Sequence, residues 1–320
     1  MKKLRRQLLL MVIIVITLIA FYLLINVNFN HLGFALSLRL PRLVAMSLAA
    51  ICIGISAMVF QSVVNNRIVT PSLLGMSSLY TLMHTAVYFV LGSTSVIARN
   101  QNLAFGIDII LMAVVGTFVY GFLFKKTKYN ILYILLIGTV MGNLFGSIQE
   151  TLTRVMDPNE YESLLTTLVA SFSNENASIL ILSAILIALV LLFLRKEFGL
   201  LDVITLGRDQ AINLGVDYDQ VTRKLLLGVV LLVSISTAMV GPISFLGLIV
   251  ANISRERFKT YRHKYLITGS MLLSLMVVLG AQLLVEHLFS FSIPISVFIT
   301  LGGGIYFLYL LLDQRKGFSS

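Results

Sequence analysis

Apolar runs long enough to cross a lipid bilayer recur along all 320 residues of this chain. Crossing about 30 Å of hydrocarbon takes roughly 20 residues of helix. Apolar residues make up 58% of the sequence and charged residues only 12%. Backbone groups in lipid must form hydrogen bonds within their own segment, so the runs predict helices rather than strands. We therefore predict an all-α integral membrane protein with a single polytopic membrane domain over residues 1–320.

The runs predict ten transmembrane helices, of which one is short. The first run follows the basic residues Lys2, Lys3, Arg5 and Arg6, but no small-x-small cleavage site follows it, so we interpret it as a retained span and not as a signal peptide. The nine longer runs lie at approximately Gln7–Asn26, Leu43–Phe60, Ser72–Val90, Leu103–Phe124, Ile131–Gln149, Ala177–Leu194, Lys224–Val240, Tyr265–Val285 and Pro294–Leu312.

The tenth crossing is predicted at Ile243–Asn252 from the distribution of charge. Basic residues favour the cytoplasmic side, and this crossing leaves only Arg39, Arg42, Arg99 and Arg154 of the 24 Lys and Arg residues outside. Ten residues of helix cover only about 15 Å, so the segment must be surrounded by protein. The topology places both termini in the cytoplasm.

Catalytic, metal-binding and nucleic-acid-binding functions have little support. The single Cys52 lies within a span, and the four histidines lack the close helical spacing of a metal site. Basic residues sit at span ends and not on one aromatic-rich face, so they indicate topology and not nucleic-acid binding. The sequence contains no Gly-x-x-x-x-Gly-Lys-Ser/Thr loop, so ATP would have to act on a separate subunit. We expect no cofactor and no metal on this chain.

A polar segment at about 195–224 interrupts the apolar runs. Ala211 lies four residues after Gly207 and four before Gly215, which predicts three small residues on one helical face that a partner could approach closely. The alternative is a solvated loop. Asp217 and Gln220 have the spacing of a capping box that would start the next helix. The topology makes this segment cytoplasmic.

The order and spacing of several motifs resemble the FecCD-type permeases, which are the membrane subunits of ABC importers for iron-siderophore complexes, haem and cobalamin. The resemblance runs nearly end to end. It rests on Arg39–Arg42, Gln61, Pro71–Gly75, Gly207–Val216, Gly241–Leu248, Ile253–Arg255 and Pro294–Leu312.

The resemblance implies the fold of a type II ABC importer permease and a set of partners. These are two cytoplasmic ABC ATPase subunits, a second permease subunit forming a homodimer or heterodimer, and an external substrate-binding protein. Ferric siderophore is the expected cargo, with haem or cobalamin as the alternative. An ATP-independent secondary transporter and a membrane-embedded enzyme remain open as other classes; neither has positive support, because no acid or base pair lies deep within one span.

The resemblance also implies roles for individual residues. Coupling to the ATPase falls on the segment from Gly207 to Gly215, and docking of the binding protein falls on the external residues Arg39 and Arg42. Glu286 stands where the family has a further docking arginine, so that contact is reversed or absent. The expected residues are Gly207, Arg208, Ala211, Leu214 and Gly215 for coupling, Arg39 and Arg42 for docking, and Asn66, Ile68 and Asn130 for the cytoplasmic gate.

Two departures from the family pattern affect the gate. The usual Asn-Pro-Leu is here Asn66-Arg67-Ile68, and loss of the proline is expected to loosen the gate. Ala251-Asn252 replaces a common Pro-His pair, so the short helix is expected to end differently.

Overall fold

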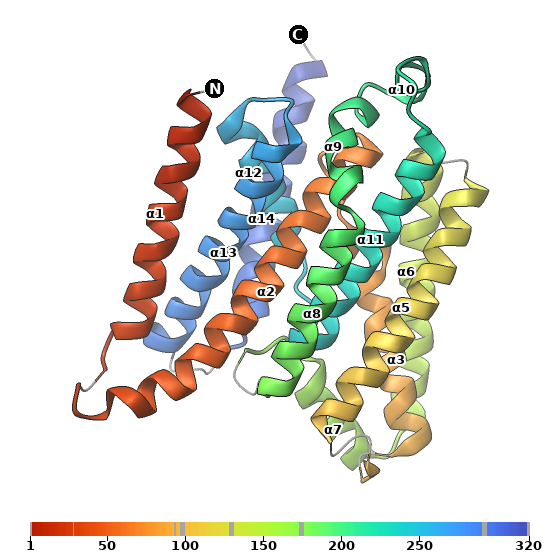
Figure 1. Cartoon of the computed structure of the whole chain (residues 1–320). Coiled ribbons are helices and arrows are strands. Elements are labelled where there is room, and N and C mark those ends of the chain that lie inside the picture. The colour runs from red at the N-terminus through yellow and green to blue at the C-terminus, as the bar shows by residue number, and fades with distance from the viewer. Residues whose placement is uncertain are drawn as a thin grey trace.

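The computed structural model describes residues 2–27, 29–92, 94–96, 100–127, 131–172, 176–289 and 293–318, and contains no strand among them. Figure 1 shows a bundle of helices running between two ends, which we call the α10 end and the α7 end. The helices are α1 (Lys2–Leu24), α2 (Leu32–Val64), α3 (Met76–Leu91), α5 (Gln101–Lys126), α6 (Ile131–Val155), α7 (Pro158–Leu168), α8 (Ala177–Phe193), α9 (Arg195–Ile204), α10 (Arg208–Asn213), α11 (Tyr218–Val240), α12 (Leu246–Phe258), α13 (His263–Leu288) and α14 (Ile295–Phe318), with the 3-10 turns η1 (Phe29–His31) and η2 (Pro71–Leu74).

Each of the ten predicted spans coincides with a helix of the structure. Among the described residues, five helices are long and apolar enough to cross a membrane on those criteria alone, and a sixth is obtained if α8 and α9 are joined across their 52° bend. The remaining predicted spans correspond to helices that are shorter or less apolar. The predicted all-helical membrane fold is therefore confirmed.

Several helix boundaries differ from the prediction. The second helix begins at Leu32, well before the predicted Leu43, and contains Pro41. Proline removes one backbone N–H from the helix ladder, and the first part of α2 runs at an angle to its remainder in Figure 1. The short tenth crossing is α12, which has 13 residues and continues to Phe258. The preceding helix ends at Val240, because the Gly241–Pro242 pair that follows it disfavours a continued helix.

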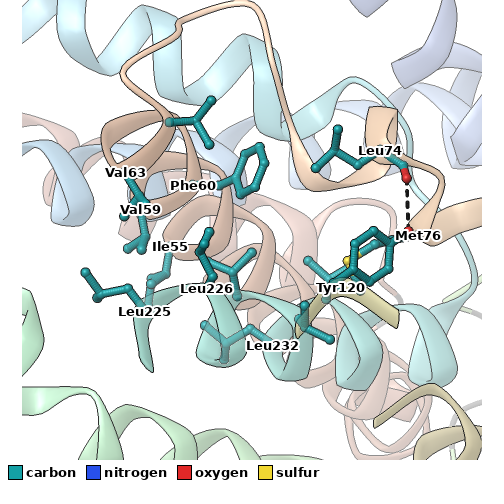
Figure 2. Packing of buried hydrophobic residues seen from close by; sticks show 14 of the residues in the cluster. Ile55, Val59, Phe60, Val63, Leu74, Met76, Tyr120, Leu225, Leu226 and Leu232 are labelled. Carbon is teal, nitrogen blue, oxygen red and sulfur yellow. Dashed lines mark hydrogen bonds between the residues drawn. The ribbon is translucent and has the colours of Figure 1, made fainter. Parts of the chain in front are cut away.

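The main hydrophobic core lies where α2, α3, α5 and α11 meet. Phe60 of α2, Met76 of α3 and Leu226 of α11 are almost fully buried there. Figure 2 shows these side chains around Tyr120 of α5, whose hydroxyl donates a hydrogen bond of 3.0 Å to the carbonyl oxygen of Leu74. The bond joins α5 to η2, so the turn that begins α3 is fixed to the core.

A close backbone contact joins the start of α3 to α6. Gly75 has a φ of +89°, and a Cβ added there would lie 2.5 Å from the Cα of Gly142. Only glycine meets both requirements without strain.

Candidate functional site

The polar segment at 195–224 folds as two short helices and the beginning of α11, all at the α10 end of the bundle (Figure 1). Asp217 starts α11, and its Oδ1 accepts a hydrogen bond of 3.0 Å from the backbone N–H of Gln220. This is the side-chain cap expected of the Asp-x-x-Gln spacing. The segment is therefore largely helical, and the alternative of a solvated loop is wrong.

The predicted face of three small residues is only partly exposed, and a coupling role for them stays a prediction. Ala211 is fully buried against its own chain, so no partner can contact it in this structure. Gly207 and Gly215 flank the six-residue α10 with φ values of +96° and +81°, and a Cβ on either would meet nothing within 4 Å. Both glycines are explained by these backbone conformations, which L-residues with side chains rarely adopt.

Three large apolar side chains are exposed in this segment, among polar ones. Leu206, Ile212 and Leu214 are 58%, 50% and 61% exposed. The predicted coupling residue Arg208 is also exposed, and it forms an ion pair of 2.8 Å with Asp219 that ties α10 to the start of α11. Large apolar side chains exposed together are typical of a protein-binding surface. We call Leu206, Ile212 and Leu214 the apolar tip.

Hydrogen bonds connect α9 with the end of α2. The Oδ1 atom of Asp202 on α9 accepts from the backbone N of His263 at 2.8 Å and lies 2.6 Å from its Nδ1. The Nε2 atom of His263 lies 3.0 Å from the Oγ of Ser62 on α2, which also accepts from Arg255 of α12 at 2.7 Å. The four side chains form a network across four helices, which we call the Asp202–His263–Ser62–Arg255 network.

The predicted gate residues Asn66 and Ile68 lie in the loop that follows this network. Asn66 Oδ1 accepts a hydrogen bond of 2.9 Å from Ile68 N. The carbonyl oxygen of Arg67 accepts from Gln61 Nε2 at 2.9 Å and from Asn252 Nδ2 at 2.8 Å. These side chains hold the loop where the family has a proline, and the expectation that proline loss loosens the gate stays a prediction. The third gate candidate, Asn130, lies outside the described residues.

Asn252 explains the second departure from the family pattern. It is buried on α12 and also donates to the carbonyl oxygen of Leu248 at 2.9 Å. An amide can serve this fixed role without a change of charge. The sequence predicted a changed helix end here, whereas the structure places Asn252 within α12. Its contact with Arg67 links α12 to the loop that contains Asn66, Arg67 and Ile68, which we call the gate loop.

The docking candidate Arg39 lies at the α7 end and is engaged inside its own chain. Its Nη1 donates to the carbonyl oxygens of Tyr22, Leu23 and Ile25 at 2.8, 3.2 and 2.8 Å, at the end of α1. Its Nη2 lies 3.4 Å from Glu286 Oε1. Glu286 is thus the internal counter-charge of Arg39.

Arg42 lies one turn further along α2 and is half-buried, close to Tyr22. The two predicted docking residues therefore have different surroundings: Arg39 is held by backbone carbonyl oxygens and Glu286, whereas Arg42 lies close to Tyr22. Docking of a partner by either residue stays a prediction.

A buried polar cluster near the α7 end was missed. His84 of α3 lies with its Nδ1 2.8 Å from Asp108 Oδ2 of α5 and its Nε2 3.0 Å from Thr167 Oγ1 of α7. Tyr80 and Tyr88 pack against the imidazole ring. The sequence search for an acid or base pair within one span could not find a pair formed between two helices. The available signal was that His84 and Asp108 each lie in a predicted apolar span.

No group of three or more His, Cys, Asp and Glu residues in the described part of the chain could hold a metal ion. The buried histidine pairs serve instead to join helices.

Comparisons with known proteins agree with this arrangement. The family model described as the FecCD transport family matches residues 7–313. The chain is 42% identical over 289 residues to the petrobactin import system permease protein YclO of Bacillus subtilis (strain 168), covering 90% of this chain and 92% of that protein. It is 33% identical over 279 residues to the petrobactin import system permease protein FatC of Bacillus anthracis, covering 87% and 78%.

A solved structure confirms the fold. An inward-facing transporter of the metal-chelate ABC type superposes with a TM-score of 0.80 over 97% of this chain and 99% of that one, at 22% identity. Together, the matched family model and the similarity to YclO establish that this chain belongs to the FecCD transport family.

Proposed function

We propose that this chain is the membrane-spanning half of an importer that carries ferric siderophore into the cytoplasm of a prokaryotic cell, driven by two separate ATPase subunits. The membership in a family of permeases supports transport rather than catalysis. The complete complex would contain a second permease subunit, identical or homologous, and an external binding protein.

The apolar tip is the observation that best supports ATPase docking. The three side chains are exposed, and α10 lies at the end of the bundle where α1 begins and α14 ends (Figure 1). The basic residues of the first helix favour the cytoplasmic side for this end. An apolar surface in the cytoplasm is stabilised by a partner that removes it from water.

The Asp202–His263–Ser62–Arg255 network offers a route from that surface to the gate. A displacement of α9 would act through Asp202 on His263, and through Ser62 on the end of α2, where the gate loop begins. The loop itself is held by Gln61 and Asn252. We propose that ATP-driven movement of the α9–α10 segment reaches Asn66 and Ile68 through these contacts.

The cargo is proposed to be ferric petrobactin. Two relatives that are 42% and 33% identical are petrobactin import permeases. Uptake of radioactive iron as ferric petrobactin, compared with haem and a hydroxamate chelate in cells that lack their own importers, tests this choice. Preferential uptake of haem or of the hydroxamate chelate would overturn it.

The docking proposal is tested by co-purification of the ATPase with variants of the apolar tip. Leu214→Asp and Ile212→Asp are expected to reduce the recovered ATPase at least tenfold, because a carboxylate would have to be desolvated at the interface. Asn213→Asp is the matched control, since it adds the same charge at an exposed neighbouring position. Equal recovery with Leu214→Asp, Ile212→Asp and the control would refute docking through the tip.

A further inference from the structure

A pocket of about 370 Å³ opens at the α10 end, between the end of α2, the gate loop and the junction of α12 with α13. Three cationic side chains line it, those of Arg67, Arg255 and Lys259. Among the described residues, no carboxylate forms an ion pair with any of the three. The pocket therefore gathers positive charge without an internal balance.

Arg255 is the deepest of the three cations. Its Nη2 donates to Ser62, but its Nε is buried and has no hydrogen-bond partner. Arg67 of the gate loop lines the same pocket and adds a second positive charge near Arg255. A buried guanidinium is unfavourable unless an anion and further acceptors compensate it.

The nearby carboxylates are engaged elsewhere. Asp202 accepts from both the backbone N and the Nδ1 side of His263. Glu256 is exposed on α12. Neither carboxylate forms an ion pair with Arg255.

The remaining polar groups around the pocket can donate to an anion. Thr260 accepts the backbone N–H of Arg262 through its Oγ1, which leaves its own hydroxyl hydrogen for a ligand. Asn66 uses its Oδ1 to accept from Ile68, and its amide nitrogen has two N–H groups to donate. Three cations and these donors on separate segments suit an oxyanion with several acceptor oxygens.

We propose that this pocket binds a phosphate group, either free inorganic phosphate or the headgroup of an anionic phospholipid. Basic pockets between membrane helices commonly accept such headgroups. The bound group would bridge Arg67 of the gate loop and Arg255 of α12, and so brace the gate loop against the bundle. Its lining shares no residue with the apolar tip, although Thr205 of the lining directly precedes Leu206.

The test is the thermal stability of the full chain in nanodiscs of phosphatidylcholine, measured while phosphate replaces chloride at constant ionic strength. Wild type is expected to gain stability in a saturable manner. Lys259→Gln changes an exposed side chain at the pocket and should raise the half-saturating phosphate concentration about tenfold, the effect of losing one charge-assisted hydrogen bond. Arg255→Gln should abolish the response. Arg257→Gln removes the same charge from the same helix outside the pocket and should respond as wild type does.

A second arm distinguishes the two sources of phosphate. Nanodiscs containing phosphatidylglycerol, without free phosphate, should stabilise wild type over Lys259→Gln if a lipid headgroup occupies the pocket. Phosphate is then added to the phosphatidylglycerol nanodiscs. If it stabilises wild type as much as it does in phosphatidylcholine nanodiscs, the free ion occupies the site. The proposal is overturned if neither arm stabilises wild type, or if Lys259→Gln and Arg257→Gln respond equally. Protection of the pocket only by a bound ATPase, with no response to either phosphate source, would assign it to a protein carboxylate and would also overturn the proposal.

Discussion

Arg39 is predicted to stabilise the protein mainly through backbone carbonyl oxygens, with its ion pair secondary. Three carbonyls at the end of α1 accept from its Nη1, two of them at 2.8 Å, whereas Glu286 lies at 3.4 Å. Both charged side chains are only 13% exposed, so water screens them weakly. The carbonyls at a helix end have no other donor within the helix.

The magnitudes separate the two contributions. Arg39→Ala leaves those carbonyls and the Glu286 carboxylate without their donor, and should lower the free energy of unfolding by about 3–4 kcal/mol. Glu286→Gln removes the charge from the longer contact with Arg39. It also relieves the burial of a charged carboxylate whose Oε2 has no hydrogen-bond partner. Its cost should be about 1 kcal/mol or less.

The decisive variant is the charge swap Arg39→Glu with Glu286→Arg. It restores opposite charges at the two positions, but a carboxylate at position 39 cannot donate to carbonyl oxygens. The swap should therefore be at least as unstable as Arg39→Ala in reversible unfolding of the full chain in one lipid or detergent. Arg154→Ala, an exposed arginine at the same end, is the control and should be near wild type. Recovery of wild-type stability by the swap would refute the reasoning.

Three further outcomes are expected. His84→Leu should cost about 3 kcal/mol, because it leaves Asp108 buried and unpaired, and adding Asp108→Leu should recover most of that loss; equal stability of the single and double variants in the same unfolding assay would contradict the pairing. Gly75→Ala should destabilise by about 1–3 kcal/mol through its φ of +89° and its contact with Gly142, and a neutral result would show that the two helices separate easily. Asp202→Asn and His263→Leu should leave ATPase binding intact while reducing transport per ATP hydrolysed, and a normal transport ratio would exclude the network as the route to the gate.

Hydropathy was sufficient to predict nine of the ten spans, because each of the nine carries its own apolar signal, whereas α12 was predicted from the distribution of charge. The break at Gly241–Pro242 and the cap at Asp217 were also predictable, since both depend on local backbone chemistry. The neighbours of individual side chains were harder to predict from the sequence. Ala211 lies in the expected segment, yet whether it faces a partner or its own chain depends on how α9 and α10 pack.

Long-range pairs were the features that the sequence could not supply. Arg39 and Glu286 are 247 residues apart in the sequence. Glu286 stands where the family has an arginine, and the sequence alone suggested an altered contact with a partner protein. In the structure, Glu286 instead forms an internal contact with Arg39. His84 and Asp108 lie on different helices, and periodicity within one span carries no information about such a pair. Leu214 of the apolar tip was among the expected coupling residues, but Leu206 and Ile212 were not, because apolar residues in a membrane protein usually indicate lipid contact.

The central claim is that ATP drives import through the apolar tip of the α10 end. The direct measurement is uptake of radioactive ferric petrobactin into proteoliposomes that contain the chain with its ATPase, binding protein and second permease subunit. Wild type should accumulate iron only with ATP, and Leu214→Asp should lose at least nine-tenths of that uptake while Asn213→Asp retains it, since only the first places charge in the apolar contact. ATP-independent accumulation, or normal ATP-driven uptake by Leu214→Asp, would contradict the account.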